Sequence, residues 1–219
     1  TAARANLLLP PLPAGSVIER IGFDRSSRQL AVSLETAQAP RDVYVYTLGT
    51  EAPLPTVQLA RWTQSEVGPI DRSKAVPALP IQFPTWDMVG NSPRLISGFV
   101  YKPATPGPHP VLMMVHGGAF KMGDKSDLQI WPELTEAGIA VVRVNYRLST
   151  SAKWPAQGED CLAAVVHLQR QGEALGLDPA RLVLLGQSAG AFLAVSTALS
   201  LVEVGLRPRG VVSLFGPMD

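Results

Sequence analysis

Cysteine and histidine are scarce in this chain, and the histidines are unevenly placed. The 219 residues include three histidines, His109, His116 and His167, and none occurs in residues 168–219. The single cysteine, Cys161, excludes an internal disulfide and gives no indication of the redox compartment. No two histidines have metal-ligand spacing with a carboxylate or a thiol, so we expect no metal site.

Charged residues and long apolar runs are also few. Only 17% of the residues are charged, the net charge is +1, and there is no basic cluster, so we expect neither nucleic acid nor an anionic membrane as a partner. No apolar run is long enough to span a bilayer, and the run at residues 7–9 is too short for a signal-peptide core. The start at Thr1 rather than at a methionine indicates that residues precede it, so export stays open.

The first third of the chain has the pattern of short alternating strands. Polar or proline-bearing turns separate four expected strands, at residues 17–23, 29–35, 43–48 and 57–62. We therefore predict that residues 1–67 form an antiparallel β region, the size of one propeller blade. Residues 68–80 contain three prolines and are predicted to be a linker without regular structure.

The pattern changes in residues 81–219. A strand is expected at residues 95–101, and continuous apolar runs, typical of strands covered on both faces, occur at 111–115, 139–144, 182–185 and 210–215. Helical patterns lie between these runs, at residues 127–137, 155–172 and 189–204. Buried strands that alternate with helices predict an α/β fold with a doubly wound, mostly parallel sheet.

Residues 182–199 have the pattern of a strand, a sharp turn and a helix. The turn, GQSAG at residues 186–190, fits the motif G-x-S-x-G of a nucleophile elbow. Flanking glycines would let the strand and the helix approach each other, while the Ser188 hydroxyl projects from the carboxyl edge of the sheet. This is the position of a nucleophile, and a purely structural glycine turn is the alternative.

A second glycine motif, HGGAF at residues 116–120, directly follows the apolar run 111–115. Successive glycines at the carboxyl edge of a sheet expose backbone N–H groups, which can stabilise negative charge on a carbonyl oxygen. The loop matches the HGGG type of lipases and esterases, with Ala119 in place of the last glycine. The expected donors of this oxyanion hole are the N–H groups of Gly118, Ala119 and Ala189. The alternative is a glycine turn shaped only by packing.

Four motifs occur in a fixed order over residues 111–219: HGGAF from His116, NYRLS from Asn145, WPAQGEDCLAAV from Trp154 and GQSAG from Gly186. In this order they resemble the hormone-sensitive-lipase-like and feruloyl-esterase-like α/β-hydrolases. The resemblance implies a serine hydrolase that cleaves small-molecule carboxylic esters through an acyl-enzyme on Ser188. It also implies that no cofactor is needed.

The upstream region resembles a different family. RDVYVYTL from Arg41, RWTQSEVG from Arg61 and IQFPTWD from Ile81 are similar to the propeller end and the catalytic-domain entry of the prolyl-oligopeptidase family. This likeness implies an alternative function, a serine peptidase that cleaves short peptides. Residues 119–120 and 190–191 depart from the loop and elbow of that family, and they favour ester over peptide cleavage.

A general base is missing from the expected place. In hydrolases with such an elbow, the acid and the histidine follow the serine, but residues 189–219 contain no histidine and only two carboxylates, Glu203 and Asp219. Asp219 is a candidate acid, although the resembled families place the acid one strand later. A sheet that ends after residues 210–215 would expose an edge. We therefore expect a missing segment or a second chain to complete the fold, and the chain alone could be an inactive fragment.

The remaining polar residues are predicted to be structural. Asp160 follows Trp154 and Pro155, and it is expected to cap free N–H groups of the helix there. His167 is expected to be packed or half-exposed on that helix, and His109 to lie in a loop. The charged loop at residues 123–127 is expected to be solvated.

Overall fold

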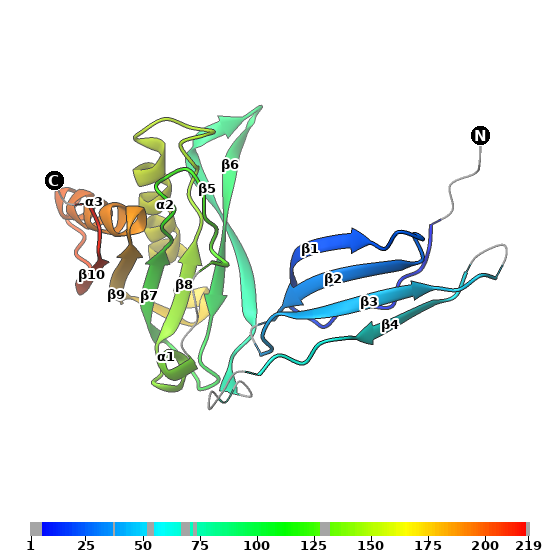
Figure 1. Ribbon diagram of the computed structural model, residues 1–219. Coiled ribbons are helices and arrows are strands. Elements are labelled where there is room, and N and C mark those ends of the chain that lie inside the picture. Colours follow the sequence, from blue (N-terminus) through cyan, green and yellow to red (C-terminus); the bar gives the residue numbers. More distant parts are fainter. Residues whose placement is uncertain are drawn as a thin grey trace. The chain divides into compact units, whose positions relative to one another are not determined.

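The computed structural model describes residues 6–36, 38–51, 55–66, 71, 74–127 and 132–217. The chain divides into two units, Thr1–Pro77 and Ala78–Asp219. The first unit contains one sheet, and the second contains a larger sheet with helices (Figure 1).

The first unit is a four-stranded antiparallel sheet. Its strands are β1 (Val17–Phe23), β2 (Gln29–Glu35), β3 (Asp42–Leu48) and β4 (Val57–Arg61), in the order β1-β2-β3-β4. The four predicted strands are confirmed, each to within one residue. A small core forms on one face around Val32, Leu34 and Tyr46, and the Tyr46 hydroxyl donates to the carbonyl oxygen of Pro10 at 2.8 Å. The likeness of this sheet to a propeller blade stays a prediction.

The second unit is an α/β fold around a six-stranded sheet. Its elements are β5 (Ala78–Val89), β6 (Ser92–Tyr101), β7 (His109–Val115), α1 (Pro132–Glu136), β8 (Ala140–Val144), α2 (Ala156–Gln171), β9 (Leu177–Gln187), α3 (Ala189–Glu203) and β10 (Gly210–Leu214), with a 3-10 turn at Glu173–Leu175. The strand order is β10-β9-β7-β8-β6-β5. The four strands β10, β9, β7 and β8 are parallel, and β6 and β5 are antiparallel. The predicted α/β fold with a mostly parallel sheet is confirmed.

The core of this unit lies around the central strands. Every residue of β8 is buried, as are all residues of β7 except Pro110, which agrees with their mostly apolar sequences, although His109 and Arg143 are also buried. Helices α2 and α3 pack against each other, and both contact β9. Cys161 of α2 and Ala191 of α3 are completely buried there, so the prediction of a core cysteine is confirmed.

One predicted boundary is wrong. Residues 78–80 belong to β5, although they were expected to continue an irregular linker. Pro80 and Pro84 are tolerated because β5 is at the edge of the sheet, where a strand has one side without a hydrogen-bonded neighbour. Proline content therefore misled the boundary prediction at an edge strand.

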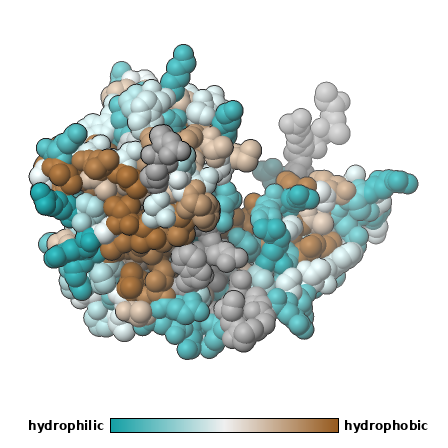
Figure 2. All heavy atoms as spheres, turned by 60° about the vertical axis from the view of Figure 1, so that its left-hand side comes forward, coloured by the Kyte–Doolittle hydropathy of each residue, from teal (hydrophilic) through white to brown (hydrophobic). Residues whose placement is uncertain are grey.

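The opposite edge of the sheet is β10. In the described part of the chain β10 pairs only with β9. Figure 2 shows hydrophobic side chains gathered on this side of the unit. The exposed apolar residues of α3, β10 and the segments that flank β10 are Leu199, Val202, Val204, Leu206, Val211, Val212 and Phe215.

Candidate active site

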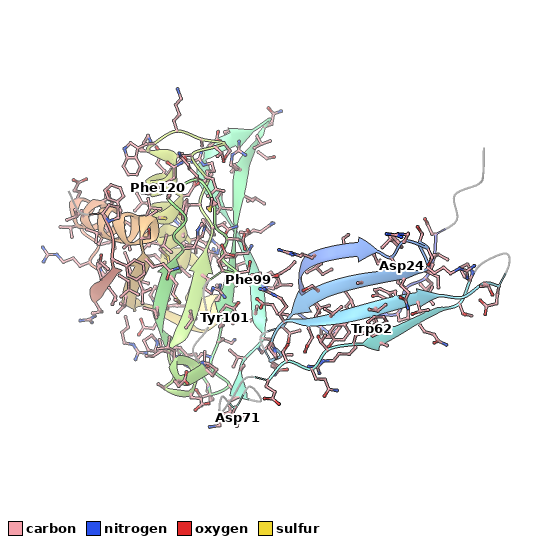
Figure 3. All side chains as sticks on the ribbon, viewed as in Figure 1. Asp24, Trp62, Asp71, Phe99, Tyr101 and Phe120 are labelled. Atoms are coloured by element: carbon pink, nitrogen blue, oxygen red, sulfur yellow. The ribbon has the colours of Figure 1, made fainter. Side chains whose placement is uncertain are left out.

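The site lies where two neighbouring parallel strands end. Strands β7 and β9 are paired with Val115 opposite Gly186, so the HGGAF loop and the elbow emerge side by side. From β7 the chain continues to β8 on one side, and from β9 it continues to β10 on the other. Connections that diverge in this way leave a crevice at the carboxyl ends of the strands. Figure 3 shows Phe120 of the HGGAF loop at this end of the sheet.

Ser188 joins β9 to α3 in a strained backbone conformation. Its φ is 51° and its ψ is −124°, a region that costs free energy for a residue with a side chain. The Ser188 N–H donates to the carbonyl oxygen of Leu214 at 2.9 Å, and the Ser188 carbonyl accepts from the N–H of Ala191 at 2.9 Å. The residue is half-buried, so the turn is open to solvent. This geometry is that of a nucleophile elbow.

The glycines of the elbow are required by close backbone contacts. A Cβ on Gly186 would lie 2.0 Å from the carbonyl oxygen of Gly190. A Cβ on Gly190 would lie 2.2 Å from the carbonyl oxygen of Val115 and 2.4 Å from that of His116. The two glycines therefore let the elbow close tightly and let α3 begin against the end of β7.

The HGGAF loop borders Ser188. A Cβ on Gly117 would lie 3.3 Å from the Cβ of Ser188. Gly118, Ala119 and Phe120 have φ values of 108°, 51° and 62°, so the backbone turns through three consecutive left-handed residues. The Gly118 carbonyl closes this turn by accepting from the N–H groups of Lys121 at 2.9 Å and Met122 at 3.1 Å.

The three predicted oxyanion donors have no hydrogen-bond partner among the residues that the structure describes. Within the described residues, the N–H groups of Gly118, Ala119 and Ala189 donate no hydrogen bond. Ala189 directly follows Ser188 as the first residue of α3, and the first N–H groups of a helix have no partner within it. These donors are therefore free to bind an oxygen atom of a ligand.

His116 and Tyr146 support the loop from within the core. The His116 ring is buried and stacked on the Tyr146 ring, with centroids 4.3 Å apart. The Nδ1 of His116 lies 2.8 Å from the Gly117 carbonyl oxygen, and the Tyr146 hydroxyl lies 3.1 Å and 3.2 Å from the carbonyl oxygens of His116 and Gly117. Burial lowers the pKa of His116, which favours the neutral ring. Sequence reasoning missed the role of Tyr146, although the motif NYRLS contains it.

The charged loop at residues 123–127 is held by hydrogen bonds to Asn145. Lys125 donates its N–H to Oδ1 of Asn145 at 2.6 Å, and Nδ2 of Asn145 donates to Oδ2 of Asp124 at 2.7 Å. Partial burial raises the pKa of Asp124, but hydrogen bonds from Ser126 and Asn145 outweigh it and lower that pKa to about 2. Residues 123–126 are partly exposed and Asp127 is exposed, in agreement with a solvated loop, and Asn145, which follows β8, binds residues 124 and 125.

The predicted helix-capping role of Asp160 is wrong. Helix α2 begins at Ala156, so Asp160 lies in the second turn, and its carboxylate is completely buried. Oδ2 accepts from the N–H and the Nε of Arg147 at 2.8 Å and 2.9 Å, and Oδ1 accepts from Nη2 of Arg147 at 2.8 Å and from the Thr85 hydroxyl. These hydrogen bonds to Asp160 raise the pKa of Arg147. Both oxygens of the carboxylate accept hydrogen bonds in this network, in agreement with a structural role.

An aromatic cluster lies beside the elbow. Phe192 is one turn after Ser188 on α3, and its ring contacts the rings of Phe120 at 5.9 Å and Trp154 at 5.7 Å between centroids. The cluster joins the HGGAF loop, the start of α2 and the start of α3. It places apolar rings near Ser188.

No described side chain activates the serine. His167 is half-buried against the Phe83 ring at 5.9 Å, as expected, whereas His109 is buried in β7 rather than placed in a loop, with its Nε2 2.9 Å from the Thr105 carbonyl. Within the described residues no hydrogen bond joins the Ser188 hydroxyl to a base. Asp219, the candidate acid, lies outside the described residues.

Two further searches cover the described part of the chain. It contains no cluster of three or more His, Cys, Asp or Glu residues that could hold a metal ion. None of its helices combines the length and the apolar character that crossing a membrane would need.

Comparisons with known proteins find esterases. Residues 99–206 match the BD-FAE family model. The chain is 38% identical over 92 residues to ethyl acetate hydrolase of Pseudomonas putida, a match that covers 41% of this chain and 29% of that protein. Among solved structures, a bacterial heroin esterase matches 60% of this chain and 41% of its own, with 34% identity and a TM-score of 0.53. Carboxyl esterase 2 of Tuber melanosporum matches 65% of this chain and 45% of its own, with 28% identity and a TM-score of 0.56.

The second unit has the α/β-hydrolase fold, and its solved structural neighbours are esterases. The resemblance to α/β-hydrolase serine esterases is confirmed, whereas the resemblance of the upstream region to a propeller stays a prediction. The chain spans less than half the length of the relatives that it matches.

Proposed function

We propose that the protein hydrolyses carboxylic esters through an acyl-enzyme on Ser188. The observation that carries this proposal is the juxtaposition of the strained Ser188 turn with the unbonded N–H groups of Gly118, Ala119 and Ala189. Such donors stabilise the negative charge that develops on the carbonyl oxygen during acyl transfer. The esterase relatives support the same reaction.

The reaction would proceed in two steps. The Ser188 oxygen attacks the acyl carbon, its proton passes to a general base, and the carbonyl oxygen becomes an oxyanion held by the three N–H groups. Collapse of this intermediate breaks the ester bond, and the alcohol leaves with a proton from the protonated base. Water then attacks the acyl-enzyme, which releases the carboxylic acid and regenerates Ser188.

We propose that the general base comes from outside the described residues, from a further segment or from a second chain. The relatives are more than twice as long as the segments that this chain matches, and the described residues contribute no base to Ser188. Asp219, which also lies outside the described residues, remains a candidate for the catalytic acid. The chemistry proposed here needs no cofactor.

Ester cleavage is favoured over peptide cleavage at this site. The cited relatives are esterases, and the Phe120–Phe192–Trp154 cluster gives the acyl or alcohol group of an ester apolar surface beside the nucleophile. A blocked aminoacyl anilide cleaved faster than a p-nitrophenyl ester would reverse this preference.

Replacement of the nucleophile tests the proposal. Ser188→Ala should lower the hydrolysis of p-nitrophenyl acetate by at least about 10³-fold, because no other group forms the acyl-enzyme. The same variant should lose labelling by a fluorophosphonate probe, read by intact-protein mass spectrometry. Ser200→Ala on the same helix is the matched control and should behave as the parent. If the parent is active and Ser188→Ala retains that activity, the proposed function is wrong.

A further inference from the structure

The orientation of the oxyanion loop is set through its carbonyl groups. In a trans peptide, the C=O of one residue and the N–H of the next point in opposite directions, because the peptide unit is planar. The peptides of the HGGAF loop are trans. A hydrogen bond that fixes the Gly117 carbonyl therefore also fixes the direction of the Gly118 N–H.

The Gly117 carbonyl has two partners. The Nδ1–H of His116 donates to it across 2.8 Å, and the Tyr146 hydroxyl lies 3.2 Å from it and 3.1 Å from the His116 carbonyl oxygen. The hydroxyl thus contacts two successive peptides, the second of which contains the Gly118 N–H. The next peptide, with the Ala119 N–H, is held separately by the bonds from Lys121 and Met122 to the Gly118 carbonyl.

The surroundings make this contact rigid. Tyr146 and His116 are both buried, their rings are stacked, and Gly123 closes the other side, since a Cβ there would lie 2.5 Å from Nδ1 of His116 and 2.6 Å from the Gly117 carbonyl oxygen. Hydrogen bonds in such a dry environment have no competing water. The carbonyls of His116 and Gly117 are therefore held on the core side of the loop.

We propose that Tyr146 is a positioning residue of the oxyanion hole, and that its hydroxyl, with the His116 ring, aims the Gly118 N–H at the ester carbonyl oxygen. The inference rests on the proposed function and extends it to a residue that touches neither the substrate nor the reacting atoms. A hydroxyl that only filled the core would affect stability. A hydroxyl that aims a donor affects the transition state more than the bound substrate.

The test compares Tyr146→Phe with the parent. The variant keeps the ring stacked on His116 and removes only the hydroxyl. With p-nitrophenyl acetate, kcat should fall roughly tenfold, because a donor is misdirected rather than deleted, and KM should stay within about twofold. Inhibition by an arylboronic acid, whose tetrahedral serine adduct places an oxygen in the hole, should weaken by a similar factor. His116→Phe removes the other donor to the Gly117 carbonyl and should show the same kcat-against-KM pattern.

A matched control separates positioning from stability. Tyr46→Phe removes a buried hydroxyl that donates to Pro10 in the other unit, and it should leave kcat and boronate inhibition unchanged. An unchanged kcat and unchanged boronate affinity in Tyr146→Phe, with or without a lower melting temperature, would overturn the inference. If the parent is active and depends on Ser188, that result leaves the proposed function standing.

A second readout needs no turnover. In the chain labelled with ¹⁵N-glycine, which has 19 glycines, Tyr146→Phe should lower the order parameter of the Gly118 amide from the rigid value of about 0.85. Gly158 in helix α2 should be unaffected. A Gly118 amide that stays equally rigid and unshifted in Tyr146→Phe would contradict the role assigned to the hydroxyl.

Discussion

At the scale of single residues, the site depends on backbone contacts that leave no room for a side chain. The carbonyl oxygens that a Cβ on Gly190 would meet belong to Val115 and His116, at the end of β7 and the start of the HGGAF loop. Backbone atoms cannot rotate away as a flexible side chain can. Any added atom at Gly190 must therefore move the elbow and the loop apart.

Gly190→Ala should accordingly damage the site more than the core. Separation of Ser188 from the oxyanion donors by a fraction of an ångström to 1 Å should lower kcat/KM by about 100-fold, with a destabilisation of about 1–3 kcal/mol. Steady-state kinetics and urea unfolding measure the two effects. Gly210→Ala in β10 is the control, because a Cβ there meets nothing within 4 Å. Full activity in Gly190→Ala would mean that the elbow can shift freely.

At the scale of elements, a buried ion pair joins the segment after β8 to helix α2. Arg147 binds Asp160 through its backbone N–H and its guanidinium, and Nη1 of Arg147 also reaches Oδ2 of Asp87 on β5 at 3.2 Å. Tyr146, which contacts the carbonyls of the HGGAF loop, directly precedes Arg147. The pair therefore holds the segment that carries Tyr146.

Asp160→Asn should be strongly destabilising, because it leaves the Arg147 charge without its buried partner. Loss of one member of such a pair costs about 3–5 kcal/mol. The control is Asp178→Asn, whose partner Arg181 is half-exposed and whose removal should cost less than about 1 kcal/mol. Urea unfolding at neutral pH compares the two. Equal losses in both variants would show that burial does not strengthen the Arg147–Asp160 pair.

The same pair shows where prediction from sequence ends. Periodicity reports which positions are buried, so β1, β2, α2 and α3 could be placed to within one residue. Periodicity does not show which polar group of another element a buried carboxylate binds. The prediction for Asp160 was therefore a cap of the nearby helix end rather than an ion pair with Arg147. Proline content likewise indicated a linker at residues 78–80, because nothing local marks an edge strand.

At the scale of the whole molecule, buried strands that alternate with helices were sufficient to predict the α/β fold, and motif order pointed to Ser188 and three N–H groups as candidate site groups. It could not show that Tyr146 and His116 hold the loop, since that contact needs β7 and β8 to be neighbours in the sheet. An aromatic residue that follows a strand can contact many different groups, and the pairing of the strands determines which contact it makes. The sequence could therefore propose reacting groups but not the residues that hold the loop in place.

Protonation of histidine should set the acid side of the stability profile. Burial is the largest influence on the pKa of His116, and it lowers this pKa. The hydrogen bond to the Gly117 carbonyl and the charges of Asp124 and Asp127 raise the pKa, whereas the charge of Arg143 lowers it. The net shift is downward from the ordinary value of 6.5. Burial also lowers the pKa of His167 from 6.5. Below pH 6.5 the unfolded chain therefore binds protons that the folded chain resists. The free energy of unfolding should fall as the pH drops through this range, well before Asp124, with a pKa of about 2, is protonated.

Urea unfolding at pH 7.5, 6.5 and 5.5 measures this loss for the parent, for His116→Phe and for His167→Gln. Each substitution removes one titrating group, so each variant should lose less stability than the parent between pH 7.5 and 5.5. His167→Gln leaves the oxyanion loop intact, and its effect should therefore appear in stability alone, with kcat unchanged. The two effects should add in the double variant, because one ring packs on Tyr146 and the other on Phe83. A parent whose stability rises on acidification, or variants that keep its full pH dependence, would show that neither buried ring resists protonation.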